Sequence, residues 1–330
     1  MENRKKQVLN RIIGIVTIPI ITLMIMVLLC STKGIVLFAT GENVTSFFRS
    51  VSTVMLTTLA LSINLNSGRF DFSIGSISLL SSIISSQICI KYGMSTSCML
   101  IISLVSGLLL GIVSGAIYVI VKLPPIIVSL GVALFYEGMA FAITKGYGVT
   151  FVTNAELTSF PKTINYVIVI LISLLIVYML FEYTKFGYNY KTLLSGQKVS
   201  VNTGIKEIPN AIACYSICGT LMGMVGFLSA TNTGNIQLAL NFGSIGIMFT
   251  AFLPMFIGGF IGRFCNDKVG YLLGAVTTAL ISLMYTRLKV DSSIQQITTA
   301  LILVGFLIFL NNEEKIRSIF GKRKETGNEV

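Results

Sequence analysis

Long apolar runs, almost free of charge, limit most strongly what this chain of 330 residues can fold into. An α-helix needs about 18 or more apolar residues to cross the hydrocarbon core of a bilayer, which is about 30 Å thick. The runs lie at 12–31, 46–66, 72–90, 97–121, 125–144, 165–181, 209–230, 246–262, 269–286 and 294–311. This pattern predicts an all-α, polytopic membrane protein of about ten transmembrane helices that forms one domain over residues 1–330.

Composition argues against a soluble protein. Hydrophobic residues make up 54% of the chain and charged residues only 11%, whereas about a quarter of an ordinary globular sequence is charged. A net charge of +11 would indicate nucleic acid as the partner of a soluble protein. Here the basic residues lie at the ends of apolar runs, where they anchor to lipid headgroups. We therefore expect a multi-pass protein of the cell membrane, with the lipid bilayer and not nucleic acid as its surroundings.

The distribution of lysine and arginine predicts the topology, because cytoplasmic loops of membrane proteins carry an excess of both. Most of the 24 lysines and arginines fall in alternate connections, at 1–11, 67–71, 122–124, 182–208, 263–268 and 312–330. The excess predicts that both termini face the cytoplasm, with cytoplasmic tails at 1–11 and 312–330. It also makes 182–208 a long cytoplasmic loop.

Glycines recur at spacings of three or four residues in three of the runs. They are Gly107, Gly111 and Gly115, then Gly219, Gly223 and Gly226, and finally Gly270 with Gly274. Small residues let helix backbones approach closely in lipid, where no hydrophobic effect drives helices together. The glycines predict tightly packed helices and no particular function.

The chain lacks the residues that most enzymatic sites need. It has no G-x-x-x-x-G-K-[S/T] loop for nucleotide phosphates, and it has no histidine for proton relays or metal ligands. We therefore expect no enzymatic activity, no metal and no cofactor on this chain. The six cysteines are expected to be free thiols, and Cys89 with Cys98, which flank one short loop, is the only candidate disulfide pair.

Glu137 is the one acid deep inside an apolar run. A charged group at the centre of a bilayer costs roughly 3 kcal/mol or more, so its side chain should face protein or water. It is a candidate for a transport pathway or for ion coupling. It could equally be a structural partner for a lysine or arginine of a neighbouring helix, or reach toward the outer interface.

Two apolar runs meet at the segment NSGRFDFSIGS, residues 66–76. The charges of Arg69 and Asp71 can offset each other, and Asp71 with Ser73 is well placed to start the following helix. The segment is either a capped cytoplasmic turn or an irregular break that lines a cavity within the membrane. With the second reading, the candidate translocation path consists of Asn64, Asp71, Ser73, Glu137 and Gln295.

Four stretches of the chain carry a family resemblance. They are GRFDFSIGS at 68–76, TKFGYNYKTLLSGQKVSVNTGI at 184–205, ATNTGNIQ at 230–237 and SIQQITTALILV at 293–304. In this order they resemble the permease subunits of ABC importers for ribose and other simple sugars, a family that includes the autoinducer-2 permeases.

The resemblance implies a permease that moves a small solute, such as a monosaccharide or a related polar molecule, by alternating access. Its partners would be a separate ABC ATPase that holds the ATP and magnesium, an extracytoplasmic solute-binding protein and a second permease subunit. A short coupling helix at about 197–203 would dock on the ATPase. The coupling residues would be Gly196, Gln197, Val199, Ser200, Thr203, Gly204 and Ile205.

The chain also departs from the family pattern. Arg69 stands in place of a glycine, Glu137 in place of an arginine, and Met248 and Thr250 where the family has acidic residues. Two other functions therefore stay open at this point. One is an ion-coupled secondary transporter that uses Glu137 and Asp71, and the other is a membrane scaffold that transports nothing.

Overall fold

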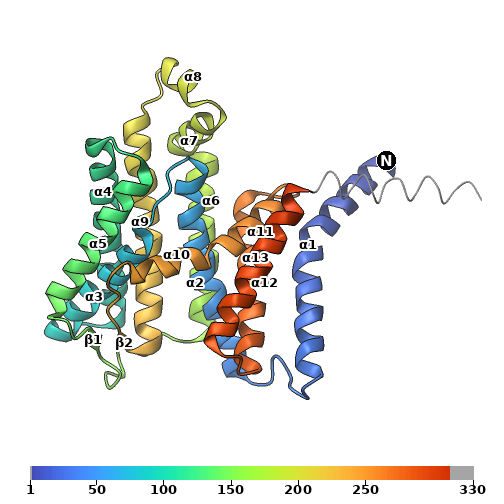
Figure 1. Ribbon diagram of the computed structural model, residues 1–330, viewed down its shortest axis with the longest axis horizontal. Coiled ribbons are helices and arrows are strands. Elements are labelled where there is room, and N and C mark those ends of the chain that lie inside the picture. The colour runs from blue at the N-terminus through green and yellow to red at the C-terminus, as the bar shows by residue number, and fades with distance from the viewer. Residues whose placement is uncertain (1, 313–330) are drawn as a thin grey trace, which may run out of the picture.

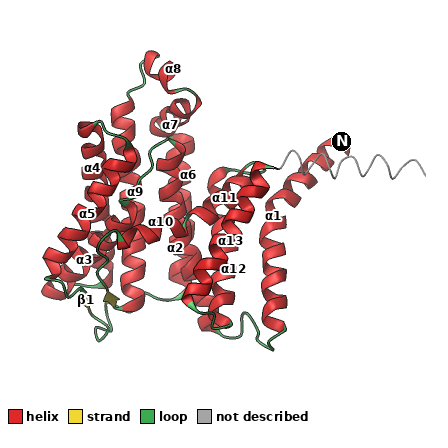
Figure 2. Cartoon of the chain, in the orientation of Figure 1, coloured by secondary structure: helices red, strands yellow, loops and turns green. Residues whose placement is uncertain are grey.

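The computed structural model describes residues 2–312, which form a bundle of helices with one two-residue strand pair (Figures 1 and 2). The helices are α1 Glu2–Ser31, α2 Gly41–Asn66, α3 Ile74–Tyr92, α4 Thr96–Val121, α5 Pro125–Thr144, α6 Thr163–Tyr183, α7 Lys185–Ser195, α8 Gln197–Asn202, α9 Glu207–Thr233, α10 Gly246–Thr250, α11 Phe252–Gly262, α12 Asp267–Arg287 and α13 Ser292–Asn311. A 3₁₀ turn, η1, covers Gly243–Ile245, and β1 Val149–Thr150 pairs antiparallel with β2 Asn235–Ile236.

The prediction of ten membrane spans is confirmed for the part of the chain that the structure describes. Ten segments are long and apolar enough to cross a bilayer, and their ends lie within a few residues of the predicted ones. The segment predicted as the N-terminal tail, 1–11, is helical from Glu2 onward and continues into α1. Of the predicted tail at 312–330, all but Asn312 lies outside the described residues.

Glycines pack α4 directly against α9. A Cβ atom added at Gly107 would overlap the carbonyl of Gly219, and one added at Gly223 would overlap the carbonyl of Ser103. The Ser103 hydroxyl donates to the carbonyl of Gly223 at 2.8 Å. Backbone contact this close is possible only for glycine, so the two predicted glycine stripes are the two sides of one helix interface.

The eighth span is broken in its middle, whereas the sequence predicts one helix over 246–262. The chain leaves the end of α9 through β2, re-enters the bundle, and forms η1 and then α10, which lies across the other helices in Figure 1. Only α11 then continues along the bundle. Its 11 residues span about 16 Å, about half of a hydrocarbon core. Irregular backbone of this kind is tolerated in a membrane only where protein or water surrounds it.

Both ends of the described chain and the α7–α8 segment lie on the same side of the bundle, at the top of Figure 1. This arrangement fits an even number of spans. That this side of the bundle faces the cytoplasm stays a prediction from the distribution of lysine and arginine. All six cysteines are free thiols in the structure, so Cys89 and Cys98 do not form the candidate disulfide.

Candidate functional site

A short surface helix, α8, stands at the tip of the bundle where the sequence predicts a helix at about 197–203. The hydroxyl of Ser200, which is buried, donates to the carbonyls of Thr192 and Gly196, both at 2.8 Å. Because Thr192 belongs to the last turns of α7, this one side chain fixes the angle between the two helices.

The turn that leaves α8 depends on backbone geometry. Gly204 has φ +93°, a left-handed conformation that favours glycine. Its amide donates to the carbonyl of Val201 at 3.0 Å, and the amide of Ile205 donates to the carbonyl of Ser200 at 3.1 Å. The Thr203 hydroxyl also donates to the Ser200 carbonyl. Gly196, at φ 171°, has an extended conformation that any residue adopts.

All residues of α8 except Ser200 are exposed, and two of them are apolar. Val199 is 70% exposed and Val201 is 43% exposed. Exposed β-branched side chains on a helix whose pose is fixed by hydrogen bonds are suited to contact another protein, since little order has to be gained on binding.

Tyr190 anchors α7 to the membrane bundle, a role that sequence reasoning missed. Its hydroxyl donates to the carbonyl of Ile63 in α2 at 2.9 Å, and its ring packs edge-on against Phe181 at 5.0 Å between centroids. Burial raises the pKa of the Tyr190 hydroxyl above its ordinary value, so the group stays a neutral donor. Movement of α7 and α8 is therefore coupled to the C-terminal end of α2.

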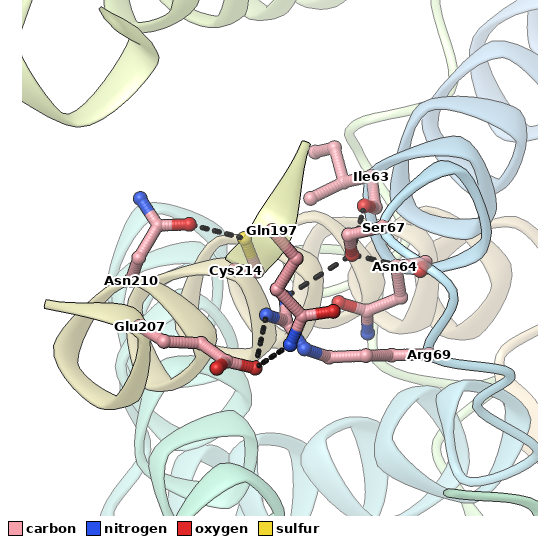
Figure 3. A network of polar contacts seen from close by, with 8 residues as sticks. All are labelled: Ile63, Asn64, Ser67, Arg69, Gln197, Glu207, Asn210 and Cys214. Atoms are coloured by element: carbon pink, nitrogen blue, oxygen red, sulfur yellow. Dashed lines mark hydrogen bonds and ion pairs between the residues drawn. The ribbon is translucent and has the colours of Figure 1, made fainter. Parts of the chain in front are cut away.

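Figure 3 shows a polar network that includes Gln197, the first residue of α8. Glu207 is the first residue of α9. Its carboxylate accepts a hydrogen bond from the side-chain amide of Gln197 at 2.7 Å and lies 3.9 Å from the guanidinium of Arg69. Arg69 also donates to the hydroxyl of Ser67 at 3.1 Å. The expected pairing of Arg69 with Asp71 is wrong, because the connection between α2 and α3 turns the two side chains toward different partners.

A cavity of about 220 Å³ adjoins this network. Its lining residues come from the α2–α3 connection, α7, α8 and the start of α9, and they are Asn66, Ser67, Arg69, Tyr190, Leu193, Leu194, Gln197, Glu207 and Asn210. The cavity leaves space between the surface helices and the end of the membrane bundle.

Asp71 starts α3, as its position in the sequence predicts. Its carboxylate accepts from the amide of Ser73 at 2.9 Å, from the hydroxyl of Ser73 at 2.6 Å, and from the side-chain amide of Asn64 at 3.1 Å. The structure thus brings together Asn64, Asp71 and Ser73 from the candidate path. All three are buried, so this part of the connection is not an open surface turn.

Glu137 is also buried, and its partners are backbone groups of the broken span. Its carboxylate accepts from the amide of Phe242 at 3.0 Å and from the amide and hydroxyl of Ser244 at 2.9 and 2.6 Å. The expected ion pair with a basic side chain is wrong for the described residues, and the alternative, a reach toward the outer interface, stays a prediction. A carboxylate at the start of a helical segment satisfies amides that have no partner within the helix.

The two irregular segments meet at this place. A Cβ added at Gly75, in the first turn of α3, would overlap the carbonyl of Ser244. Four phenylalanine rings gather beside them with centroid distances of 4.9–6.3 Å, and they are Phe70, Phe72, Phe249 and Phe252. The α2–α3 connection and the broken eighth span therefore form one interface at the centre of the bundle.

Gln295 lies apart from the other candidate path residues. It is in the first turn of α13, where its side chain donates to the carbonyl of Val290 at 2.8 Å. At the positions of the family's acidic residues, Met248 is buried, and the hydroxyl of Thr250 donates to the carbonyl of Ile247. The residues that the structure describes contain no cluster of three or more metal-ligating side chains.

Ten candidate spans, one of them broken at its centre, and a helical loop at one end describe a multi-pass membrane protein. Residues 43–310 match the family model described as the branched-chain amino acid transport system / permease component. The chain therefore belongs to this family of permease components. It is a permease subunit of an ABC importer and not itself an ATPase, and such import systems work with an ATPase and a binding protein.

Several relatives cover most of the chain. It is 24% identical over 277 residues to the autoinducer 2 import system permease protein LsrC of Photorhabdus luminescens, with 81% of both chains covered. It is 26% identical over 266 residues to the fructose import permease protein FruF of Bifidobacterium longum, covering 76% of this chain and 72% of that one. The fructose import permease protein FrcC of Rhizobium meliloti is 23% identical over 310 residues, covering 88% and 83%. No solved structure matches the chain.

Proposed function

We propose that α8 is the coupling helix on which the ATPase subunit docks, and that this side of the protein faces the cytoplasm. The proposal depends on one observation, namely an exposed helix, with Val199 and Val201 at its surface, whose pose is fixed by the buried hydroxyl of Ser200. In this proposal Gly196, Gln197, Val199, Ser200, Thr203, Gly204 and Ile205 form the docking element. The four lysines of the α7–α8 segment and its exit turn support a cytoplasmic location, and they are Lys185, Lys191, Lys198 and Lys206.

The mechanism that we propose is alternating access. When ATP closes the partner ATPase subunits, α8 and α7 move together because Ser200 joins them. Tyr190 passes this displacement to α2, and the interface between the α2–α3 connection and the broken span opens or closes. ATP supplies the energy, so no ion-coupling site within the membrane is required. A second permease subunit and an extracytoplasmic binding protein would complete the system.

The solute that we propose is a monosaccharide or a related polar molecule. The relatives named for autoinducer 2 and for fructose support this class. Small-molecule sites combine apolar and aromatic walls with a few polar groups. The four phenylalanines beside Asn64, Asp71 and Ser73 provide such a combination.

Docking is tested by affinity purification of the complex through a tag on this chain. Val199→Asp places a charge on an exposed side chain and leaves the fold intact, whereas Ser200→Asp also breaks the bond between α7 and α8. Both variants should lose the ATPase and remain monodisperse in detergent. Thr153→Asp, on an exposed loop at the other end of the bundle, is the matched control. Retention of the ATPase by Val199→Asp at the wild-type level would reject the proposal.

A further inference from the structure

We infer that Gln197, Glu207 and Arg69 form a latch that links movement of α8 to the α2–α3 connection. This inference rests on the proposed role of α8. Arg69 stands at a position where the family pattern that this chain resembles has glycine.

Three segments meet at one carboxylate oxygen. Gln197 is the first residue of α8 and donates to Glu207 Oε1 at 2.7 Å. The same oxygen faces the Arg69 guanidinium at 3.9 Å (Figure 3). Glu207 is the first residue of α9, so its position is set by a long membrane helix. A displacement of α8 therefore changes the surroundings of the carboxylate that Arg69 faces.

Burial makes Arg69 depend on this carboxylate. The side chain of Arg69 is only 6% exposed, and a guanidinium keeps its charge in proteins. Its other partners, the hydroxyl of Ser67 and the thiol of Cys214, are neutral. Among the described residues, Glu207 is the one carboxylate within ion-pair distance of Arg69. A buried cation is stable only beside an opposite charge. We therefore expect the side chain of Arg69 to move when the carboxylate of Glu207 moves.

The geometry has room for two arrangements. The separation of 3.9 Å is longer than the direct contact of about 2.8 Å that arginine and carboxylate form when they hydrogen-bond. The adjoining cavity of about 220 Å³ provides space for the side chains to approach or separate. Coupling between sites needs an element with two discrete arrangements. In this ion pair the two arrangements are the observed separation of 3.9 Å and a direct hydrogen bond between Arg69 and Glu207.

Arg69 is connected to the start of α3 on its other side. Its backbone amide donates to the carbonyl of Asn64 at 2.9 Å, and the Asn64 side chain donates to Asp71 at 3.1 Å. Asp71 binds Ser73, the N-cap residue of α3, and the first turn of α3 packs against the broken span through Gly75. The latch thus lies on a continuous set of contacts from α8 to the central interface.

The first test measures hydrogen–deuterium exchange by mass spectrometry on the full-length chain in lipid nanodiscs, without the ATPase. Gln197→Ala removes the contact on α8, and Glu207→Gln removes the charge while it keeps an acceptor for Gln197. Both variants should raise amide exchange in residues 64–73 about fivefold, the low end of typical couplings between sites. Lys191→Gln, which breaks the nearby ion pair with Glu182, is the control and should leave 64–73 unchanged.

A purely stabilising ion pair predicts another pattern. In that case Gln197→Ala changes exchange only within α8, and residues 64–73 keep the protection of the wild type. This result overturns the latch. Because the measurement needs no ATPase, it is informative even if docking on α8 fails.

The second test uses the complex isolated with its ATPase. Arg69→Gln and Glu207→Gln should each raise basal ATP hydrolysis about fivefold, because the ATPase closes without moving the permease. The double variant should match the single ones, and the exchange Arg69→Glu with Glu207→Arg should bring hydrolysis back toward the wild type. The latch would be refuted if the increases in ATP hydrolysis of the two single variants multiplied in the double variant. It would also be refuted if the single variants hydrolysed ATP at the wild-type rate. Docking is tested separately, by loss of the ATPase from the Val199→Asp variant that has no change at Arg69 or Glu207, so the two proposals can fail independently.

Discussion

The carboxylate of Glu137 in α5 binds Ser244 of η1 through two hydrogen bonds, one of 2.9 Å to the backbone amide and one of 2.6 Å to the hydroxyl. A third bond, from the amide of Phe242, completes the set. Glu137 therefore positions the start of the broken span. A carboxylate whose oxygens are already bound to three donors in a buried site is poorly suited to carry an ion across the membrane.

Glu137→Ala should destabilise the protein strongly. It leaves the buried amide and hydroxyl of Ser244 and the half-buried amide of Phe242 without an acceptor, which costs about 3 kcal/mol or more. Glu137→Gln keeps one acceptor oxygen and should lose much less. The thermal unfolding midpoint in detergent, followed by size-exclusion chromatography after heating, measures the difference between the two variants.

ATP-driven uptake separates this positioning role from a pathway role. We expect Glu137→Gln to transport nearly as the wild type does, and Ser244→Ala, which removes only the hydroxyl, to do the same. If Glu137→Gln abolished uptake while its unfolding midpoint stayed normal, the carboxylate would belong to the pathway after all.

Gly75→Ala should separate α3 from the broken span. The added methyl group would overlap the carbonyl of Ser244, and overpacking of this kind costs about 1–3 kcal/mol. Gly131→Ala is a matched control, since a Cβ there meets nothing within 4 Å. The unfolding midpoint should fall for the first variant and hold for the second. An equal effect of the two substitutions would speak against the close contact between Gly75 and Ser244.

Gly219→Leu should weaken the interface between α4 and α9. A side chain at this position would meet the backbone of Gly107 and Gly111 on the facing helix. We expect low expression and aggregation in detergent, because helices in lipid have no hydrophobic effect to compensate for lost packing. Gly305→Leu, on α13 with no neighbour within 4 Å, should express normally. Normal folding of Gly219→Leu would contradict the glycine interface.

Gly204→Ala should act on α8 alone. The left-handed φ of +93° costs a residue with a side chain about 1–3 kcal/mol, but an added Cβ meets no other atom. We expect the exit turn of α8 to loosen, with faster amide exchange in residues 200–205, an unchanged global unfolding midpoint and weaker retention of the ATPase. Unchanged exchange in this turn would show that glycine is not required there.

The positions of the ten spans and of α8 could be predicted from the sequence. Apolar runs of membrane length and flanking charges locate each helix within a few residues, and the resemblance at 184–205 gives the helix at Gln197–Asn202. The break at Thr250–Phe252 was missed, although Pro254 in the first turn of α11 is a signal for it, because proline is tolerated at a helix start and disrupts a helix interior.

Long-range partners were the other part that sequence reasoning could not supply. The glycine stripes predict close packing, but nothing in them tells that Gly107 faces Gly219. Glu137 is conspicuous as a buried acid, yet its partners are backbone amides, which every residue possesses. Arg69 was noticed as a departure from the family, but its partner Glu207 gives no local signal.

Site-specific photo-cross-linking from α8 tests the central claim most directly. A benzophenone side chain at Val199, which is exposed, should form an adduct with the ATPase subunit in intact membranes, whereas the same side chain at Val152, at the other end of the bundle, should not. An adduct from Val152, or none from Val199, would contradict the claim that the ATPase acts on this protein through α8.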